Sequence, residues 1–174
     1  SYLYLHGVDF QENVERCPNT IATIKEVLPR HYHHAFFSAL SPNTHITPHF
    51  GPTNKKLRIH LPLVVEGDGA WLRVADKRVD LEQGKAILFD DSFEHEAGND
   101  NPSSPRVVLV VDIWHPDLTD EEIKFLSFVN KGQINAAKKM KELVSQENDS
   151  EASGGSIDND DQDFLSIIEN AKNK

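Results

Sequence analysis

Two histidines in this 174-residue chain occupy positions from which a strand end could present a metal ligand. His49 directly precedes a Gly-Pro turn, and His95 follows a predicted strand end and an acidic turn. The chain between them reads as several strands and hairpins, and in a jelly roll an early and a later strand can meet at the mouth of the barrel. Imidazole nitrogen suits Fe(II) as well as zinc. The pattern therefore indicates a metal site made by His49 and His95.

A second group of polar residues lies on strands that are otherwise apolar. Residues 57–65 alternate, which places Arg58 and His60 on one face and leucine and isoleucine side chains on the other. Arg106 opens a long apolar strand, 106–114, and is predicted to face inward from the opposite side. Buried arginines are costly without an anion, and a dicarboxylate would hydrogen-bond to both of them. Surface salt bridges with some of the many acidic residues are the alternative.

Short strands separated by turn residues make up the chain from residue 33 to about residue 114. The turns are rich in Gly, Pro, Asn and Asp, and they recur at short intervals. Regular spacing of this kind is typical of all-β barrels and jelly rolls. We therefore predict a mainly β fold of the jelly-roll type.

Helices are predicted on both sides of these strands. One begins near Pro18 and carries apolar residues at helical spacing. After the strands, Thr119 and Glu122 have the spacing of a capping box, which marks the start of a second helix. This helix is predicted to pause at Gly132 and to resume over 134–144.

The predicted elements divide the chain into a domain and a tail. The domain is expected to span 1–144, with the jelly-roll core at about 33–118 and helices at about 119–144. Residues 145–163 are polar and acidic, so we expect a disordered linker there. Residues 164–174 carry a short apolar stripe and are expected to form a short terminal helix.

Composition restricts the partners and the compartment. The net charge is -10, and nothing in the chain resembles the basic surface of a nucleic-acid-binding protein. No apolar run approaches the length of a membrane-spanning helix. The single cysteine, Cys17, excludes an intrachain disulfide. We therefore expect a cytoplasmic protein without a membrane segment, although the start at Ser1 leaves a longer parent protein open.

Four segments within about 33–118 stand out together. They are His49-Phe50-Gly51-Pro52-Thr53-Asn54, Leu57-Arg58-Ile59-His60-Leu61, Phe89-Asp90-Asp91-Ser92-Phe93-Glu94-His95-Glu96 and Asp112-Ile113-Trp114-His115-Pro116-Asp117-Leu118. Together they resemble the catalytic domain of the aspartyl/asparaginyl β-hydroxylases, in the family's order and with family-like spacing, and a weaker match extends to the amino terminus.

The resemblance implies a double-stranded β-helix, the jelly-roll form used by 2-oxoglutarate-dependent oxygenases. It also implies roles for individual residues. His49 and His95 match the iron ligands, Ser38 and Arg106 match the groups that hold the distal carboxylate of 2-oxoglutarate, and Arg58 and His60 match the groups near its metal-chelating end. Lys56 stands where well-understood members have an Arg that contacts the substrate carboxylate, so it is a tentative substrate-binding residue.

Gly51 bears on which branch of oxygenases the chain resembles. The common iron triad has two His and a carboxylate, with the acid two residues after the first His. Here that position is Gly51, which is characteristic of the β-hydroxylases, whereas the related lipid-modifying branch tends to keep an Asp. We therefore predict a site with two protein ligands.

The neighbouring acidic residues are predicted to have supporting roles. Asp90, Asp91 and Glu94 are expected to fix the ring of His95 or to cap the turn before it. His31, His33 and His34 are expected to form a solvated or partly packed cluster.

The predicted function is that of a 2-oxoglutarate- and Fe(II)-dependent dioxygenase. It would use oxygen to hydroxylate a peptidyl Asp/Asn-type side chain and release succinate and CO2. The partner is expected to be a peptide or protein substrate, with a small molecule as the alternative. Hydroxylation of a small molecule or lipid remains open, and so does a non-catalytic module that binds a metal or a dicarboxylate.

Overall fold

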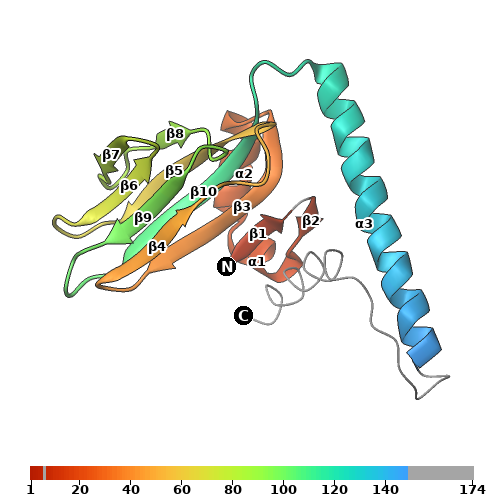
Figure 1. Ribbon diagram of the computed structural model, residues 1–174, viewed down its shortest axis with the longest axis horizontal. Coiled ribbons are helices and arrows are strands. Elements are labelled where there is room, and N and C mark those ends of the chain that lie inside the picture. The colour runs from red at the N-terminus through yellow and green to blue at the C-terminus, as the bar shows by residue number, and fades with distance from the viewer. Residues whose placement is uncertain (6, 149–174) are drawn as a thin grey trace. The chain divides into compact units, whose positions relative to one another are not determined.

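Ten strands and three helices follow one another along residues 1–5 and 7–148, the part of the chain that the computed structural model describes (Figure 1). In chain order they are β1 (Tyr2–Leu5), β2 (Val8–Asp9), α1 (Gln11–Arg16), α2 (Pro18–Val27), β3 (His31–Leu40), β4 (Thr44–His49), β5 (Lys56–Val64), β6 (Ala70–Val74), β7 (Lys77–Asp80), β8 (Ile87–Phe89), β9 (His95–Asn99), β10 (Arg106–Trp114) and α3 (Asp120–Asn148).

The strands form two antiparallel sheets. The larger sheet has the order β2-β1-β3-β10-β5-β8, and the smaller sheet has the order β4-β9-β6-β7. Strands that follow one another in the chain therefore often lie in different sheets, as in a double-stranded β-helix. This confirms the predicted mainly β, jelly-roll fold. The amino-terminal β1 and β2 extend the larger sheet beyond the predicted core, which was expected to begin at about residue 33.

One hydrophobic cluster joins residues of both sheets. The smaller sheet contributes residues such as Leu72 and Ala97, and the larger sheet contributes Val108, Val110 and Phe89. Because alternate residues of a strand point to opposite faces, the even-numbered side chains of β10 all lie on the face that meets the smaller sheet. This inner face is the one that carries the candidate site.

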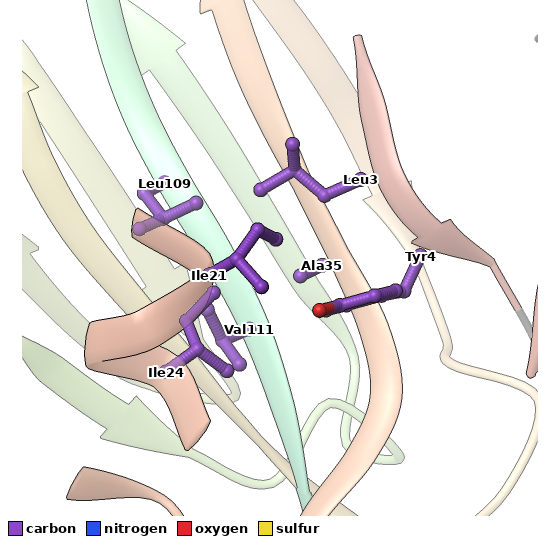
Figure 2. Packing of buried hydrophobic residues seen from close by; sticks show 7 residues of the cluster. All are labelled: Leu3, Tyr4, Ile21, Ile24, Ala35, Leu109 and Val111. Atoms are coloured by element: carbon purple, nitrogen blue, oxygen red, sulfur yellow. The ribbon is translucent and has the colours of Figure 1, made fainter. Parts of the chain in front are cut away.

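The opposite face of the larger sheet is covered by α2, as Figure 2 shows. Ile21 and Ile24 of the helix pack against Leu109 and Val111 of β10. All four side chains are buried, and burial of an aliphatic side chain contributes about 1.5–3 kcal/mol. The predicted helix that begins at Pro18 is confirmed, and it holds the central strand of the sheet from behind.

The carboxy-terminal helix differs from the prediction. Thr119 and Glu122 form the predicted capping box, since the Glu122 N–H donates to the Thr119 hydroxyl and the Thr119 N–H donates to the Glu122 carboxylate. However, α3 continues from Asp120 to Asn148 without the predicted pause at Gly132. A glycine weakens a helix by about 1 kcal/mol, and the good helix-forming residues around it outweigh that cost.

The chain separates into two compact units, Ser1–Leu118 and Thr119–Lys174. The first contains both sheets, and the second contains α3. The helix reaches four residues into the segment that was predicted to be a linker. The rest of that segment and the predicted terminal helix lie outside the described residues. In the described part of the chain, no helix has the length and apolar character that crossing a membrane requires.

Candidate metal and anion site

The two histidines singled out from the sequence are direct partners across the smaller sheet. His49 ends β4, His95 begins β9, and the register of the two strands places them opposite each other. Their ring centroids are 4.2 Å apart. His95 is 4% exposed, whereas His49 is exposed to solvent. The pairing therefore puts one buried and one accessible imidazole side by side at the edge of the barrel.

The hydrogen bonds of both rings leave the same nitrogen available. Nδ1 of His49 lies 2.9 Å from the carbonyl oxygen of Thr47, and Nδ1 of His95 lies 3.0 Å from that of Phe93. A carbonyl oxygen only accepts, so each Nδ1 carries the proton and each neutral ring keeps a lone pair on Nε2. Burial, outweighing the hydrogen bond to Phe93, lowers the pKa of His95 and favours this neutral form. Two imidazoles that direct Nδ1 to a carbonyl and leave Nε2 to a ligand are a suitable donor set for a divalent transition metal.

Gly51 has no room for the third ligand of the common triad. A Cβ atom at residue 51 would lie 2.6 Å from Cγ and from Oδ2 of Asp91, and 2.7 Å from its carbonyl oxygen. The backbone is tied in the same place, because the N–H of Gly51 donates to the Asp91 carbonyl oxygen at 2.6 Å. Within the described residues, no group of three or more His, Cys, Asp or Glu side chains is placed to hold a metal ion. The geometry thus leaves a pair of histidines rather than a triad.

The predicted anion-binding residues share the inner face of the larger sheet. In the register of β10 with its two neighbours, Ser38 of β3 is opposite Val108 and His60 of β5 is opposite Val110. Arg106 lies two residues before Val108 and so projects from the same face. Ser38 is half-buried, and the other two polar side chains are buried.

One detail of the prediction is wrong. Arg106 was expected to face the interior from the side opposite Arg58, but the two residues lie on adjacent strands of one sheet, β10 and β5. The two strands are antiparallel, and Arg58 and Arg106 lie at opposite ends of the segment over which they pair. The residue of β10 directly opposite Arg58 is Asp112. The two arginines therefore meet different partners.

Arg106 is a buried cation that has no counter-ion among the residues that the structure describes. It is 2% exposed, and its Nε and Nη1 atoms have no hydrogen-bond partner in the described part of the chain. Burial lowers the pKa of Arg106 to about 10, which still leaves it charged at neutral pH. An unpaired buried guanidinium is costly, so this residue marks a place that an anion can occupy.

His60 connects this anion position to the paired histidines. Burial, followed by the charges of Arg106 and Arg58, lowers the pKa of His60 to about 3, so the ring is neutral at neutral pH. Its ring meets the ring of Phe89 edge-on at 5.0 Å between centroids, and Phe89 meets His95 at 5.5 Å. A continuous row of rings therefore leads from the histidine pair to the interior, where Arg106 lies.

Arg58 belongs to a buried network of charges that sequence reasoning did not foresee. Its Nε and Nη2 atoms donate to the two oxygens of Asp112, at 2.8 and 3.0 Å, and its Nη1 lies 3.2 Å from Oδ2 of Asp91. Asp91 and Asp112 are both fully buried. The one available signal concerns Asp112, which lies on the inward face of β10, where an acidic residue needs a buried cation, whereas Asp91 lies in the turn between β8 and β9.

Lys56 lies in the same network and not at the surface where a substrate group would meet it. It is 1% exposed, and its ammonium lies 2.8 and 2.7 Å from the oxygens of Asp91 and 2.9 Å from Oδ2 of Asp112. Lys56 shares the inner face with Arg58, and its ammonium is taken up by the two aspartates, so its tentative role in substrate binding stays a prediction.

His34 completes the network. It is 9% exposed, and its Nδ1 lies 3.2 Å from Oδ2 of Asp112. Of the predicted solvated or partly packed cluster, His31 and His33 are half-buried with their ring centroids 5.3 Å apart, whereas His34 is packed in the interior. Burial alone would raise the pKa of Asp112, but hydrogen bonds from His34 and Arg58 hold it well below its usual range. Asp112 is therefore an ionised anchor at the centre of the larger sheet.

The acidic residues near His95 contact other groups than the His95 ring. Asp90 accepts a hydrogen bond from the N–H of Ser92 at 2.9 Å, which confirms the expected turn cap. Glu94 pairs with Arg73 at 3.1 Å. The ring of His95 is oriented by the carbonyl of Phe93 instead of by a carboxylate.

Two facing antiparallel sheets, with a histidine pair at one edge and an inward arginine between them, define a jelly-roll protein with a candidate site for a metal and an anion. A cupin protein from Bacteroides fragilis is among the structural neighbours, with a TM-score of 0.40 and 13% identity over 49% of this chain and 69% of that one. This likeness concerns the fold alone.

The sequence comparisons identify the family. The model of the aspartyl/asparaginyl beta-hydroxylase family matches residues 1–116. The human aspartyl/asparaginyl beta-hydroxylase is 47% identical over 90 residues, which are 52% of this chain and 12% of that protein. An ornithine lipid ester-linked acyl 2-hydroxylase from Rhizobium tropici is 38% identical over 117 residues, 66% of this chain and 41% of that protein. The chain belongs to the aspartyl/asparaginyl β-hydroxylase family and spans less than half the length of these two relatives.

Proposed function

We propose that this protein is a 2-oxoglutarate- and Fe(II)-dependent dioxygenase that hydroxylates a peptidyl Asp/Asn-type side chain. The observation that carries the proposal is the buried, unpaired Arg106 on the same inner face as the neutral His60, which the row of rings joins to the histidine pair. A metal without a bound dicarboxylate would leave that guanidinium unexplained. A dicarboxylate without a metal would leave the two free Nε2 atoms unexplained.

The residues divide into three tasks. His49 and His95 hold the metal through Nε2. Arg106, with Ser38 beside it, takes the distal carboxylate of 2-oxoglutarate. His60 donates or accepts as a neutral ring near the metal-chelating end, and its low pKa keeps it from adding a further positive charge.

Arg58 has a less direct part in this assignment. The guanidinium is already held by two carboxylates, so it positions Asp91 and Asp112 beside the site. When held by His49 and His95, iron would supply, with 2-oxoglutarate and oxygen, the oxidising chemistry in which one oxygen atom enters the substrate and the other enters succinate, with loss of CO2. The chain itself orients the cosubstrate and keeps water from the interior.

Gly51 and Asp91 support a two-ligand site. Because the Asp91 carboxylate fills the space that a side chain at residue 51 would need, the third carboxylate ligand is excluded by packing. This favours the peptide-hydroxylating branch over a lipid-modifying branch, and the higher identity to the human relative agrees with that choice. The name of the Rhizobium relative keeps lipid hydroxylation as the second candidate.

One experiment tests the proposal. Anaerobic protein is mixed with Fe(II) and 2-oxoglutarate, the visible charge-transfer band is recorded, and oxygen is then admitted while succinate is measured. We expect the band first and succinate afterwards. A folded protein that gives neither the band nor succinate would contradict the oxygenase proposal, and a band without succinate would indicate the non-catalytic module.

A further inference from the structure

The helix α3 carries large apolar side chains that solvent reaches. They are Phe125, Phe128, Met140 and Leu143, each about half exposed or more, with Phe128 at 75%. Because successive residues of a helix are rotated by about 100°, these four fall within a sector of about 120°. The buried Ile134 lies outside that sector. The exposed side chains therefore form one stripe along the helix, which we call the apolar face of α3.

The apolar face is long enough to be an interaction surface. Val129, Gly132 and Ala136 lie in the same sector, between the two pairs of large side chains. At about 1.5 Å of rise per residue, the distance along the helix from Phe125 to Leu143 is roughly 27 Å. A contiguous exposed apolar surface of this kind marks a place where a protein meets a partner or a membrane.

The same helix is strongly basic, although the chain as a whole is acidic. Between residues 123 and 141 there are five lysines and no acidic residue, whereas the net charge of the chain is -10. The lysines are Lys124, Lys131, Lys138, Lys139 and Lys141. Within the described residues, the first four of them form no ion pair. They are therefore available as cations for an external anionic surface.

Three of these lysines line one side of the helix. Lys124, Lys131 and Lys138 are seven residues apart, which is close to two helical turns, and this lysine row borders the apolar face on the side of Phe128. Helices that lie in a membrane interface have this composition. Their apolar side chains enter the acyl-chain boundary, and the flexible lysine side chains place their ammonium groups among the lipid headgroups.

The acidic residues at the start of α3 do not cancel the lysine row. Asp120, Glu121 and Glu122 all precede the basic stretch. Lys131, the middle member of the row, is nine residues from Glu122, which is roughly 13 Å along the helix. Salt at about 0.1 M screens exposed charges beyond about 10 Å, so the row keeps its positive potential.

Charge favours a lipid surface over a second copy of the chain as the occupant of the apolar face. A second copy would bring five further lysines, with no acidic residue between 123 and 141 to pair with either set. An anionic bilayer supplies an apolar phase and negative charge together, and each lysine near its surface strengthens binding. The two features of α3 are thus satisfied by one partner.

We propose that α3 binds the surface of an anionic lipid bilayer, with its apolar face at the acyl-chain boundary and the lysine row at the headgroups. The helix begins at Asp120, after the residues 1–116 that the family model matches. The inference therefore goes beyond the proposed function and does not depend on it. It gives the chain a means of peripheral membrane attachment by a helix that lies along the surface.

Vesicle sedimentation tests the inference with the full chain. The protein is mixed with vesicles of phosphatidylcholine alone, or with vesicles that also contain about 30% phosphatidylserine, in about 0.1 M salt. We expect binding to the anionic vesicles to be at least about tenfold stronger, and to weaken when the salt is raised to about 0.5 M. Absence of binding to the anionic vesicles, or equal binding to both kinds, overturns the inference.

Substitution of the lysine row tests the electrostatic part. Lys124→Gln, Lys131→Gln and Lys138→Gln together remove three positive charges and keep good helix-forming residues. We expect binding to anionic vesicles to fall at least about tenfold, because each lysine near the surface contributes about fivefold. The matched control removes the same charge from exposed lysines outside α3 and should change binding less than about twofold. It combines Lys25→Gln, Lys77→Gln and Lys85→Gln. Equal losses in the two triple variants overturn the role of the row.

Substitution of the two phenylalanines tests the apolar part. Phe125→Gln with Phe128→Gln should lower vesicle binding at least about tenfold, since both side chains are exposed in the protein and would be buried in the bilayer. Val27→Gln with Val79→Gln is the control, because these exposed apolar residues lie outside α3. Circular dichroism checks that the helix is retained. If it is not, the preference of the unaltered protein for anionic vesicles decides the inference.

Two other results would assign the face to a different partner. Self-association that rises with concentration in sedimentation velocity, and that the phenylalanine variant abolishes, would indicate a second copy if no vesicles are bound. Binding to polyglutamate without binding to vesicles would indicate an acidic protein. Either result overturns the lipid proposal.

Discussion

Gly51 and Asp91 compete for one volume, which the Asp91 carboxylate occupies. The N–H of Gly51 donates to the carbonyl of Asp91, and a Cβ atom at residue 51 would approach the side chain of Asp91 to 2.6 Å. The Asp91 side chain cannot move aside at low cost, because both of its oxygens contact the buried ammonium of Lys56. The absence of a ligand side chain at residue 51 is therefore built into the packing.

Substitution of Gly51 should destabilise the protein. Gly51→Ala forces a contact far shorter than van der Waals distance, and overpacking of this kind costs about 1–3 kcal/mol. Gly132→Ala is the matched control, because a Cβ atom there meets nothing within 4 Å and the residue is helical. It should stabilise the protein by about 0.5–1 kcal/mol. Urea denaturation measures both, and equal effects of the two substitutions would contradict the packing argument.

Substitution of Arg106 should raise the stability of the ligand-free protein and abolish its response to 2-oxoglutarate. Without ligand, Arg106→Met removes an unpaired buried charge, so the free energy of unfolding should not fall and is expected to rise. A ligand that binds the folded state raises its thermal stability. 2-Oxoglutarate should therefore raise the melting temperature of the unaltered protein and should leave that of the variant unchanged. Thermal denaturation with and without 2-oxoglutarate measures this.

The control for Arg106 is the exposed Arg16 of α1. Arg16→Met should keep the full response to 2-oxoglutarate, because this residue lies at the surface of the protein. A normal response in the Arg106→Met protein would show that the dicarboxylate is held elsewhere.

Removal of either member of the histidine pair should abolish tight metal binding. Removal of a residue that hydrogen-bonds to a metal ligand typically lowers metal affinity about 10–100-fold. Removal of one of the two ligands themselves should lower it further. His49→Ala and His95→Ala are compared with His45→Ala, which alters the same strand as His49 but removes a pair with Glu96 and a ring contact with Trp71. Equilibrium dialysis with Mn(II) measures the affinities, and similar losses in all three variants would argue against the assigned ligands.

Asp112 should be the most sensitive member of the buried charge network. Asp112→Asn keeps the shape but leaves Lys56, Arg58 and His34 with one negative charge fewer, and breaking a buried ion pair costs about 3–5 kcal/mol. Asp80 provides the control, since its pair with Arg78 at 3.9 Å is exposed and Asp80→Asn should change stability by less than about 0.5 kcal/mol. A small effect at Asp112, measured by urea denaturation, would show that the network is not structural.

His60 should make stability depend on pH. Its folded pKa of about 3 lies below the ordinary value of 6.5, so between these values the unfolded chain binds a proton that the folded chain does not. Stability therefore falls as the pH is lowered through this window, by about 2 kcal/mol between pH 6.5 and about 4.5 for this one group. His60→Gln should remove that part of the dependence. His45→Gln, at a side chain that is 47% exposed, should retain it.

The sequence alone was sufficient for the fold class, for the histidine pair and for the inward arginines. Alternation along β5 and β10 placed Arg58, His60 and Arg106 on the faces they occupy, because the two-residue period of a strand is a local property. The capping box at Thr119, which marks the start of α3, could be predicted because it too is a local pattern. The continuity of α3 through Gly132 could not be predicted, because a single glycine lowers helix propensity without deciding whether the helix ends there.

Only the tertiary structure decided which charges are paired. Lys56 and Arg58 are 35 and 54 residues from the aspartates that hold them, Asp91 and Asp112 respectively, and no local pattern links such positions. Arg58 and Arg106 have similar sequence surroundings, but only Arg58 is paired with carboxylates among the described residues. The register of β5 and β10 places Arg58 opposite Asp112, whereas Arg106 lies at the other end of β10. The space at Gly51 was likewise settled by a distant side chain, because packing is decided by the contacts that the folded sheet creates.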